Sequence, residues 1–167
     1  MKIEEWNKLS KEQKDYVCIN QNLDIEFIKQ IWKGLSKYQK ENVYIYQNLD
    51  IEFIKQIWKR LSKEQKNNIC NNQNLDIEFI EQLWNKLDEK QRDYICLDQS
   101  LPITFIKQIW NELRKYQRDY VCEYQNLDIN FIKQYWNELD EYQKNIIKTK
   151  SDNITKLVLL GLEKGEK

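Results

Sequence analysis

The sequence predicts an all-α fold, a right-handed α-solenoid of about six two-helix repeats, each 26 residues long. Three observations lead to this prediction. The segment "QNLDIEFIKQIWK" starts at Gln21 and recurs unchanged at Gln47, and looser copies start at Gln73, Gln99 and Gln125. Every copy begins 26 residues after the previous one, without insertion or deletion. The apolar residues of each copy follow a helical period, and units of this size bury their apolar faces by stacking on neighbours.

The array is expected to form one elongated domain over residues 1–167. Trp6 lies 26 residues before Trp32, so the chain starts inside a repeat. Near the other end, Leu162 lies 26 residues after Trp136, in a degenerate copy. Terminal repeats differ from the others because one of their faces meets water. The predicted partial repeat, full repeats and capping helix occupy 1–21, 22–149 and 151–163.

The first half of each repeat is expected to be a helix. In Leu23–Leu35 the apolar residues stand at offsets 0, 4, 5, 8, 9 and 12, which form one stripe at a 3.6-residue period. Asp24 precedes the stripe, where its carboxylate can cap free amides. Pro102 replaces this aspartate in one copy, which fits only a helix start, because a proline further in would cost ~3 kcal/mol.

The second half of a repeat opens with a capping box, a cap residue followed three positions later by glutamine, as in Ser36 and Gln39. Arg114 breaks this pattern once, so the turn before Gln117 is expected to fray. Two rows of glutamines do not vary between copies and are expected to form structural ladders. These rows are Gln30, Gln56, Gln82, Gln108 and Gln134, and Gln13, Gln39, Gln65, Gln91, Gln117 and Gln143.

A leucine-rich repeat is the rival fold, since its period of roughly 20–29 residues is similar. The stretch "NVYIYQNL" (Asn42–Leu49) could supply the strand of such a repeat. A strand needs alternating apolar residues, yet the position of Ile45 is Asn71 in the third copy and Glu123 in the fifth. The alternation fails, and the helical solenoid is favoured.

Tryptophans recur once per copy in the middle of the apolar stripe. A row of this kind could stack bases, but its place in the stripe favours a structural core, with each indole N–H bonded in the next repeat. The predicted core tryptophans are Trp32, Trp58, Trp84, Trp110 and Trp136.

Composition argues against an enzyme. The chain has 27 basic and 27 acidic residues, a formal net charge of zero, and no histidine, the commonest general base and metal ligand. Its 3 glycines and 1 proline form no phosphate-cradling loop. We therefore expect no catalytic residue, no cofactor and no metal site. No stretch is apolar enough to span a membrane and no signal peptide is evident, so a cytoplasmic protein is expected.

The 4 cysteines, Cys18, Cys70, Cys96 and Cys122, share one repeat position. Equivalent residues on stacked helices lie ~8–10 Å apart, too far for the ~4.4–6.8 Å that a disulfide requires. We expect no disulfide, and small, partly buried packing residues instead.

Binding residues should lie where the copies differ, because packing constrains those positions least. Tyrosines are the conspicuous variable residues, and most fall on the second helix, which lines the concave side of many helical solenoids. Tyrosines set among charged residues are typical of protein-binding surfaces, although they could equally extend the core. The predicted partner-binding residues are Tyr38, Tyr44, Tyr46, Tyr116, Tyr124, Tyr142, Lys33, Lys37 and Arg60.

The stretch "LSKYQKENVYIYQNLDIEFIKQIW" (Leu35–Trp58) resembles a class of short helical repeats in phage and large-DNA-virus proteins. The shared letters are a tryptophan or other aromatic, "S-x-Y-Q-x" and "L-S/D-x-x-F-I". The resemblance covers nearly the whole chain and implies no catalytic residue. It implies a mobile-element setting, in which small non-enzymatic proteins block a host defence complex, as anti-CRISPR proteins do.

A protein partner is favoured over nucleic acid. Neutralising several phosphates requires an excess of positive charge, which this chain lacks. A local basic cluster nevertheless spans the second and third copies, at Lys33, Lys37, Lys40, Lys59, Arg60, Lys63 and Lys66. The alternative function is therefore an RNA- or nucleotide-binding repeat with a surface of lysines and tyrosines.

Overall fold

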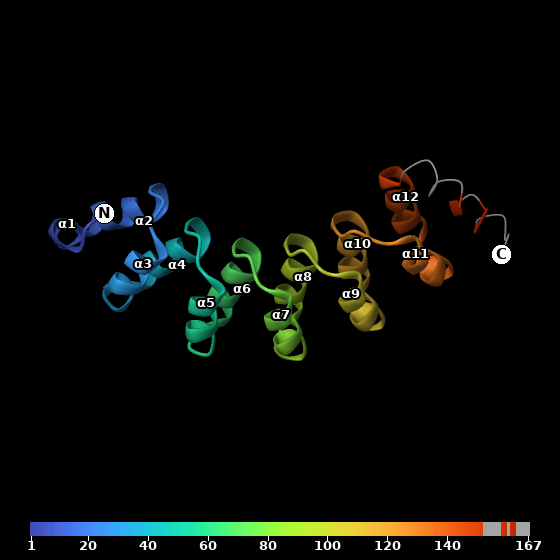
Figure 1. The fold of residues 1–167 in the computed structure, drawn as a ribbon, viewed down its shortest axis with the longest axis horizontal. Coiled ribbons are helices and arrows are strands. Elements are labelled where there is room, and N and C mark those ends of the chain that lie inside the picture. The colour runs from blue at the N-terminus through green and yellow to red at the C-terminus, as the bar shows by residue number, and fades with distance from the viewer. Residues whose placement is uncertain (152–157, 160, 163–167) are drawn as a thin grey trace. The chain divides into compact units, whose positions relative to one another are not determined.

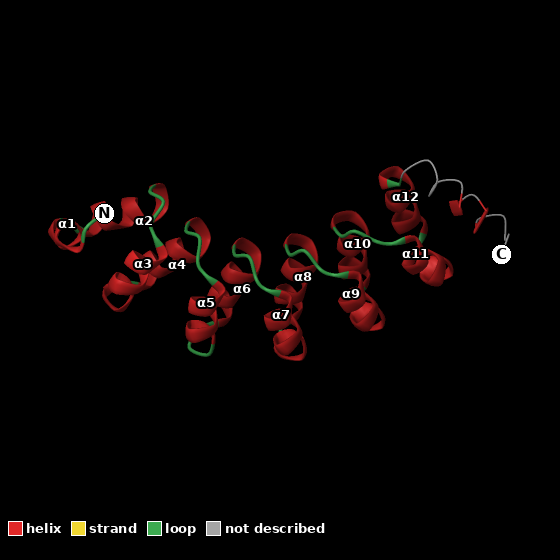
Figure 2. Ribbon diagram, viewed as in Figure 1, coloured by secondary structure: helices red, strands yellow, loops and turns green. Residues whose placement is uncertain are grey.

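The computed structural model describes residues 1–151, 158–159 and 161–162 (Figure 1). In this part of the chain every regular element is a helix and no strand occurs (Figure 2). This confirms the all-α helical-repeat fold over the leucine-rich repeat. The capping helix predicted at 151–163 falls largely outside the described residues, although its residues 158–159 and 161–162 are helical.

The chain forms two compact units, Met1–Gln91 and Arg92–Lys167. Their boundary falls inside helix α8 (Glu89–Asp98), within a repeat and not between repeats. A single domain over 1–167 stays a prediction.

In the first unit, each repeat pairs a first helix, ending in a short 3-10 turn or a bend, with a longer second helix. The second helices α2, α4 and α6 pack in series (Figure 1). The elements are α1 Ile3–Lys8, α2 Lys11–Asn20, α3 Ile25–Ile31, the turn Trp32–Gly34, α4 Lys37–Tyr46, α5 Ile51–Trp58, α6 Lys63–Asn72, α7 Ile77–Leu83 and the turn Trp84–Lys86.

The second unit repeats the same plan, and its second helices α10 and α12 pack against each other. Apart from α8, its elements are α9 Ile103–Ile109, the turn Trp110–Glu112, α10 Lys115–Tyr124, α11 Ile129–Tyr135, the turn Trp136–Glu138 and α12 Glu141–Lys150.

The first helices are shorter than the stripe Leu23–Leu35 predicts. Helix α3 begins only after Asp24, whose carboxylate accepts the amide N–H of Glu26 at 2.9 Å, and it tightens into a 3-10 turn at Trp32. Pro102 precedes α9 with a φ of −67°, which confirms that this proline marks a helix start.

The second helices begin at the predicted capping boxes. At α4, Ser36 and Gln39 each accept the backbone N–H of the other, at 3.2 and 3.0 Å. Arg114 has no side-chain cap, yet its own N–H donates to Gln117 at 3.1 Å. Half of the capping box therefore survives at Arg114, because this hydrogen bond needs only the backbone of the cap residue.

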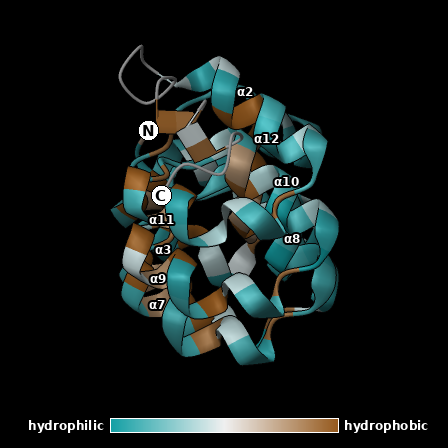
Figure 3. Cartoon of the chain, turned by 90° about the vertical axis from the view of Figure 1, so that its right-hand side faces the viewer, coloured by the Kyte–Doolittle hydropathy of each residue, from teal (hydrophilic) through white to brown (hydrophobic). Residues whose placement is uncertain are grey.

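The core follows the predicted stripe. The ribbons of α7 and α9 carry apolar segments, whereas α8 and α10 are mostly hydrophilic (Figure 3). Of the five predicted core tryptophans, all but Trp32 are buried. Trp32 is half-buried, and its ring lies 5.7 Å from that of Tyr44, which stands where other repeats have a cysteine. The indole N–H of Trp110 is buried without a partner, so the predicted bond to the next repeat is wrong there.

One predicted glutamine row is a ladder between repeats. Gln39 donates its amide to Asp15 at 2.7 Å, across 24 residues. The same bond joins Gln91 to Asn67 in the first unit, and Gln117 to Asp93 and Gln143 to Asp119 in the second. The row of Gln30 is not a ladder, because Gln30, Gln56, Gln82, Gln108 and Gln134 are all exposed on the first helices.

A second ladder uses the glutamine that opens each "QNL" segment. The buried side chain of Gln47 accepts the N–H of Leu23 at 2.8 Å and donates to the carbonyl oxygens of Cys18 and Gln21. Gln47 thus supplies hydrogen bonds to backbone groups at the end of α2 and in the turn that follows this helix. Gln125 repeats these contacts in the second unit.

Candidate functional site

The predicted tyrosines of the first unit lie on helix α4. Tyr38 and Tyr46 are 53% and 55% exposed, two helical turns apart on the solvent side of the helix. Lys37 beside them is exposed and reaches Glu41 at 3.8 Å. These positions leave two aromatic side chains available for contact with another molecule.

Tyr44 must be removed from the candidate surface. It is 1% exposed and packs edge-on against Trp32. The reason is that it occupies the cysteine position, which is buried in every repeat that carries a cysteine there. Tyr16 on α2 must be added, since it is 61% exposed. Its equivalent on α4, Asn42, is buried in a helix that packs on α2, whereas no described second helix precedes α2.

In the second unit, Tyr116, Tyr124 and Tyr142 are all exposed, Tyr116 most of all at 71%. The ring of Tyr124 lies 6.5 Å from that of Tyr120, one turn earlier on α10. Tyr124 also lines a shallow cavity of about 240 Å³ beside Asp98, whose pKa is raised by burial. We refer to Tyr16, Tyr38, Tyr46, Tyr116, Tyr124 and Tyr142 as the second-helix tyrosines.

Two equivalent grooves lie in the first unit, offset by one repeat. The first groove has a volume of about 770 Å³ and the second about 540 Å³. Each has an aromatic and aliphatic floor and a basic rim. The first groove is formed by Trp32, Phe53 and Ile57 with Lys33, Lys40 and Arg60, and the second by Trp58, Phe79 and Leu83 with Lys59, Lys66 and Lys86.

The structure therefore brings together three of the predicted binding residues at the first groove: Lys33 and Arg60 on its rim, and the buried Tyr44 in its lining. Lys37 does not line it. Sequence reasoning missed the second groove, although Lys59 and Lys66 stand 26 residues after Lys33 and Lys40. The 26-residue spacing of these lysines is the signal from which the second groove could have been predicted.

A cation lies over the tryptophan face in both grooves. The ammonium of Lys40 is 5.3 Å from the ring centroid of Trp32, and that of Lys66 is 5.5 Å from Trp58. Arg118 covers Trp110 in the second unit at 5.0 Å. Such cation–π contacts fix the side chain without neutralising its charge, which stays available to an anion.

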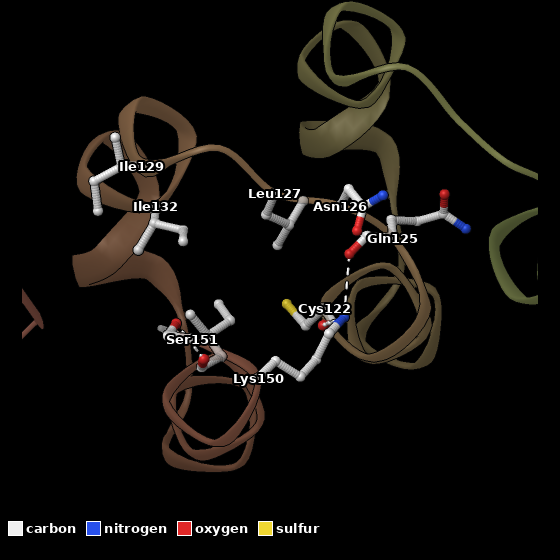
Figure 4. Close-up of a pocket in the computed structure, with 9 residues that line it drawn as sticks. Cys122, Gln125, Asn126, Leu127, Ile129, Ile132, Lys150 and Ser151 are labelled. Atoms are coloured by element: carbon white, nitrogen blue, oxygen red, sulfur yellow. Dashed lines mark hydrogen bonds between the residues drawn. The ribbon is translucent and has the colours of Figure 1, made fainter. Parts of the chain in front are cut away.

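Helix α12 of the second unit lacks the second ladder, because Ser151 stands where a "QNL" glutamine would be. Lys150 takes over part of the role, and its ammonium donates to the carbonyl oxygens of Cys122, Glu123 and Gln125. Figure 4 shows Lys150 beside Cys122 and Gln125. A cavity of about 220 Å³ is left beside it. Burial lowers the pKa of Lys150. The ammonium that borders this cavity is thus already bonded to three backbone carbonyl oxygens.

The cysteines are buried and form no disulfide. Burial raises the pKa of the Cys18 thiol to about 11 and that of Cys96 to about 12, so both are protonated at neutral pH. No three His, Cys, Asp or Glu side chains gather as a metal site within the described residues. Nor does the described part of the chain contain a helix long and apolar enough to cross a membrane.

Comparison of the chain with protein-family profiles, with curated proteins and with solved structures finds no match.

Proposed function

We propose that the chain is a non-enzymatic helical-repeat protein that binds a protein partner through its second-helix tyrosines. The observation that carries the proposal is that all six are more than half exposed, on helices whose other aromatic residues are at least half-buried. Tyrosine offers a large, amphipathic contact area at a small cost in side-chain entropy, which is why it is enriched at interface hot spots.

The absence of histidine from the sequence and the raised thiol pKa values support a role without catalysis. A buried, protonated thiol is a poor nucleophile, and no ordinary general base accompanies it. The rigid ladders between repeats suit a scaffold that presents side chains at fixed spacings.

A capture experiment tests the proposal. The tagged chain is incubated with host lysate, with and without nuclease, and the captured protein is identified, purified and titrated against the chain. Changing Tyr38, Tyr46, Tyr116 and Tyr124 to serine should abolish binding while the circular dichroism spectrum is retained.

The matched control changes exposed glutamines of the first helices, Gln30, Gln108 and Gln134, to serine and should bind normally. If the tyrosine variant still binds, the contact surface lies elsewhere. If capture is sensitive to nuclease and falls steeply with salt, the partner is a nucleic acid and the proposal is wrong.

The resemblance to phage and viral repeats adds a finer proposal, that the partner belongs to a host defence complex which the chain blocks. Its test is whether expression of the chain restores infection in cells that carry the identified defence system. The tyrosine-to-serine variant should then fail to restore it.

A further inference from the structure

The second unit shows what fits the space that the grooves leave open. Tyr135 stands where the first unit has Ile57 and Leu83, and its ring lies 5.5 Å from Trp110 and 4.6 Å from Phe131. With the tyrosine in place, Trp110 is 0% exposed. The repeat thus has room for one more aromatic ring beside its tryptophan and phenylalanine, whose own rings meet edge-to-face at 4.9 Å.

The rim changes together with the floor. The positions of Lys33 and Lys59 are taken by Asn111, and those of Arg60 and Lys86 by Glu138. Tyr135, which supplies the ring in the second unit, is thus followed three residues later by the carboxylate of Glu138. In the two grooves, where the position of Tyr135 is taken by Ile57 or Leu83, the rim is basic.

We infer that each groove of the first unit binds an aromatic side chain carried by an acidic segment of a protein partner. The ring packs on Trp32 and Phe53 in the first groove and on Trp58 and Phe79 in the second. The flanking carboxylates pair with the cations of the rim, where a guanidinium such as that of Arg60 can hold a carboxylate by two hydrogen bonds. This surface is separate from the second-helix tyrosines and does not rest on their role.

The rim cations are available to such a ligand. Lys33, Lys59, Arg60 and Lys86 are exposed, and in the described part of the chain none of them forms an ion pair. Lys29, which also lines the first groove, is by contrast paired with Asp50 at 2.8 Å. The first unit is neutral as a whole, so its positive potential is local to the grooves and can steer an acidic segment there.

A peptide fits the floor better than a nucleic acid does. Base stacking requires an open ring face, yet Lys40 lies over Trp32, and Phe53 approaches the same ring edge-to-face at 5.0 Å. In the second groove Lys66 and Phe79 do the same to Trp58. A tyrosine or phenylalanine ring needs only the gap that Tyr135 fills.

The test is fluorescence anisotropy with the full chain and a labelled peptide in which tyrosines are flanked by glutamates. Saturable binding is expected, and a peptide with serine in place of tyrosine should bind roughly tenfold more weakly or worse. The quadruple tyrosine-to-serine variant of the chain should bind the peptide normally, which separates this proposal from the proposed function.

Two double variants copy residues that the chain itself carries at the same positions. Ile57→Tyr with Leu83→Tyr fills the grooves, and Arg60→Glu with Lys86→Glu reverses the rims. Each should weaken peptide binding by about tenfold or more. Lys11→Glu with Lys37→Glu makes the same change of charge at exposed positions outside the grooves and should have little effect.

Three results would overturn the inference: no binding of the tyrosine–glutamate peptide, binding that both groove variants retain, or equal loss in the Lys11 and Lys37 control. A polyuridine oligonucleotide is titrated in parallel. The acidic-peptide assignment is wrong if the peptide does not bind and the oligonucleotide binds with an affinity that falls in the groove variants. In that case the grooves hold nucleic acid.

Discussion

The side-chain amide of Gln73 donates to the carbonyl oxygen of Tyr44 at 2.7 Å, across 29 residues of sequence. It donates as well to the carbonyl oxygen of Gln47 at 2.7 Å, while its oxygen accepts the N–H of Leu49 at 2.9 Å. One buried side chain therefore completes the backbone hydrogen bonding of the repeat before it.

The first prediction follows from these three bonds. Gln73→Leu keeps the volume but leaves one donor and two acceptors of the backbone buried without partners, each costing ~1–3 kcal/mol. We expect the free energy of unfolding to fall by roughly 3 kcal/mol or more, measured by urea denaturation. Gln108→Leu changes a glutamine that is equally invariant but exposed. In this variant the free energy of unfolding should fall by less than about 0.5 kcal/mol. Equal losses for the two would show that the ladder does not stabilise the array.

The second prediction concerns the tryptophans. Trp84 is buried and central in the array, so Trp84→Ala should cost ~3–5 kcal/mol through lost burial and the cavity that it leaves. Trp32→Ala should cost about half as much, because Trp32 is only half-buried beside Tyr44. Denaturation curves of the two variants compare them directly. A Trp84 variant of unchanged stability would place that side chain outside the core.

The third prediction concerns the end of the second ladder. Lys150→Ala removes the donor of three carbonyl oxygens and should lower the free energy of unfolding by about 1 kcal/mol, since water can replace part of the bonding. Adding Ser151→Gln to this variant should restore the loss, because a glutamine there can bond as Gln125 does to Leu101. If Ser151→Gln does not restore the lost stability, a glutamine at the end of α12 cannot form the bonds that Gln125 forms at the end of α10.

The fourth prediction is a pH dependence. The hydrogen bond from the Lys29 ammonium, at 2.8 Å, holds the pKa of Asp50 below its usual value of 3.8. The unfolded chain therefore takes up this proton at a higher pH than the folded chain does. The contribution of Asp50 is fully present above the unfolded pKa and is lost as the pH falls through the folded pKa.

Asp50→Asn, which keeps an oxygen for the helix cap, should make the loss of stability between about pH 5 and 2 shallower. Asp24→Asn is the matched control, because the place of Lys29 in its repeat is taken by Ile3. Unfolding curves across this range should differ from the parent only for the Asp50 variant. The same slope in all three proteins would contradict the role of the Lys29 bond.

Much of the fold could be predicted because its signals are local. A capping box such as Ser36 and Gln39 and an apolar stripe at helical spacing fix where helices begin and which face is buried. Burial of a polar side chain is different, because it depends on what the next repeat brings against it. Gln56 and Gln73 are equally invariant in the sequence, yet one is exposed and the other buried.

In the candidate sites, too, variation between copies does not reveal which side chains are buried. Tyr44 and Tyr46 both vary between copies, but two residues turn a helix by about 200°, so one faces the core and the other the solvent. The burial of Tyr44 could nevertheless have been predicted, because it stands at the repeat position that cysteines occupy in other copies. The first groove could not be predicted from the sequence, since its open volume depends on how the side chains of two adjacent repeats pack against each other.

Each ladder glutamine reaches only the repeat before its own, across 24 to 29 residues. A gene that encodes identical segments in tandem is prone to misaligned recombination, which removes or adds whole copies. Loss of 26 residues within the first unit would join equivalent segments, so that a glutamine such as Gln47 or Gln73 would meet an equivalent backbone in the repeat before it. The number of grooves, and with it the number of attachment points for an extended ligand, could thus change in single genetic steps without a new fold.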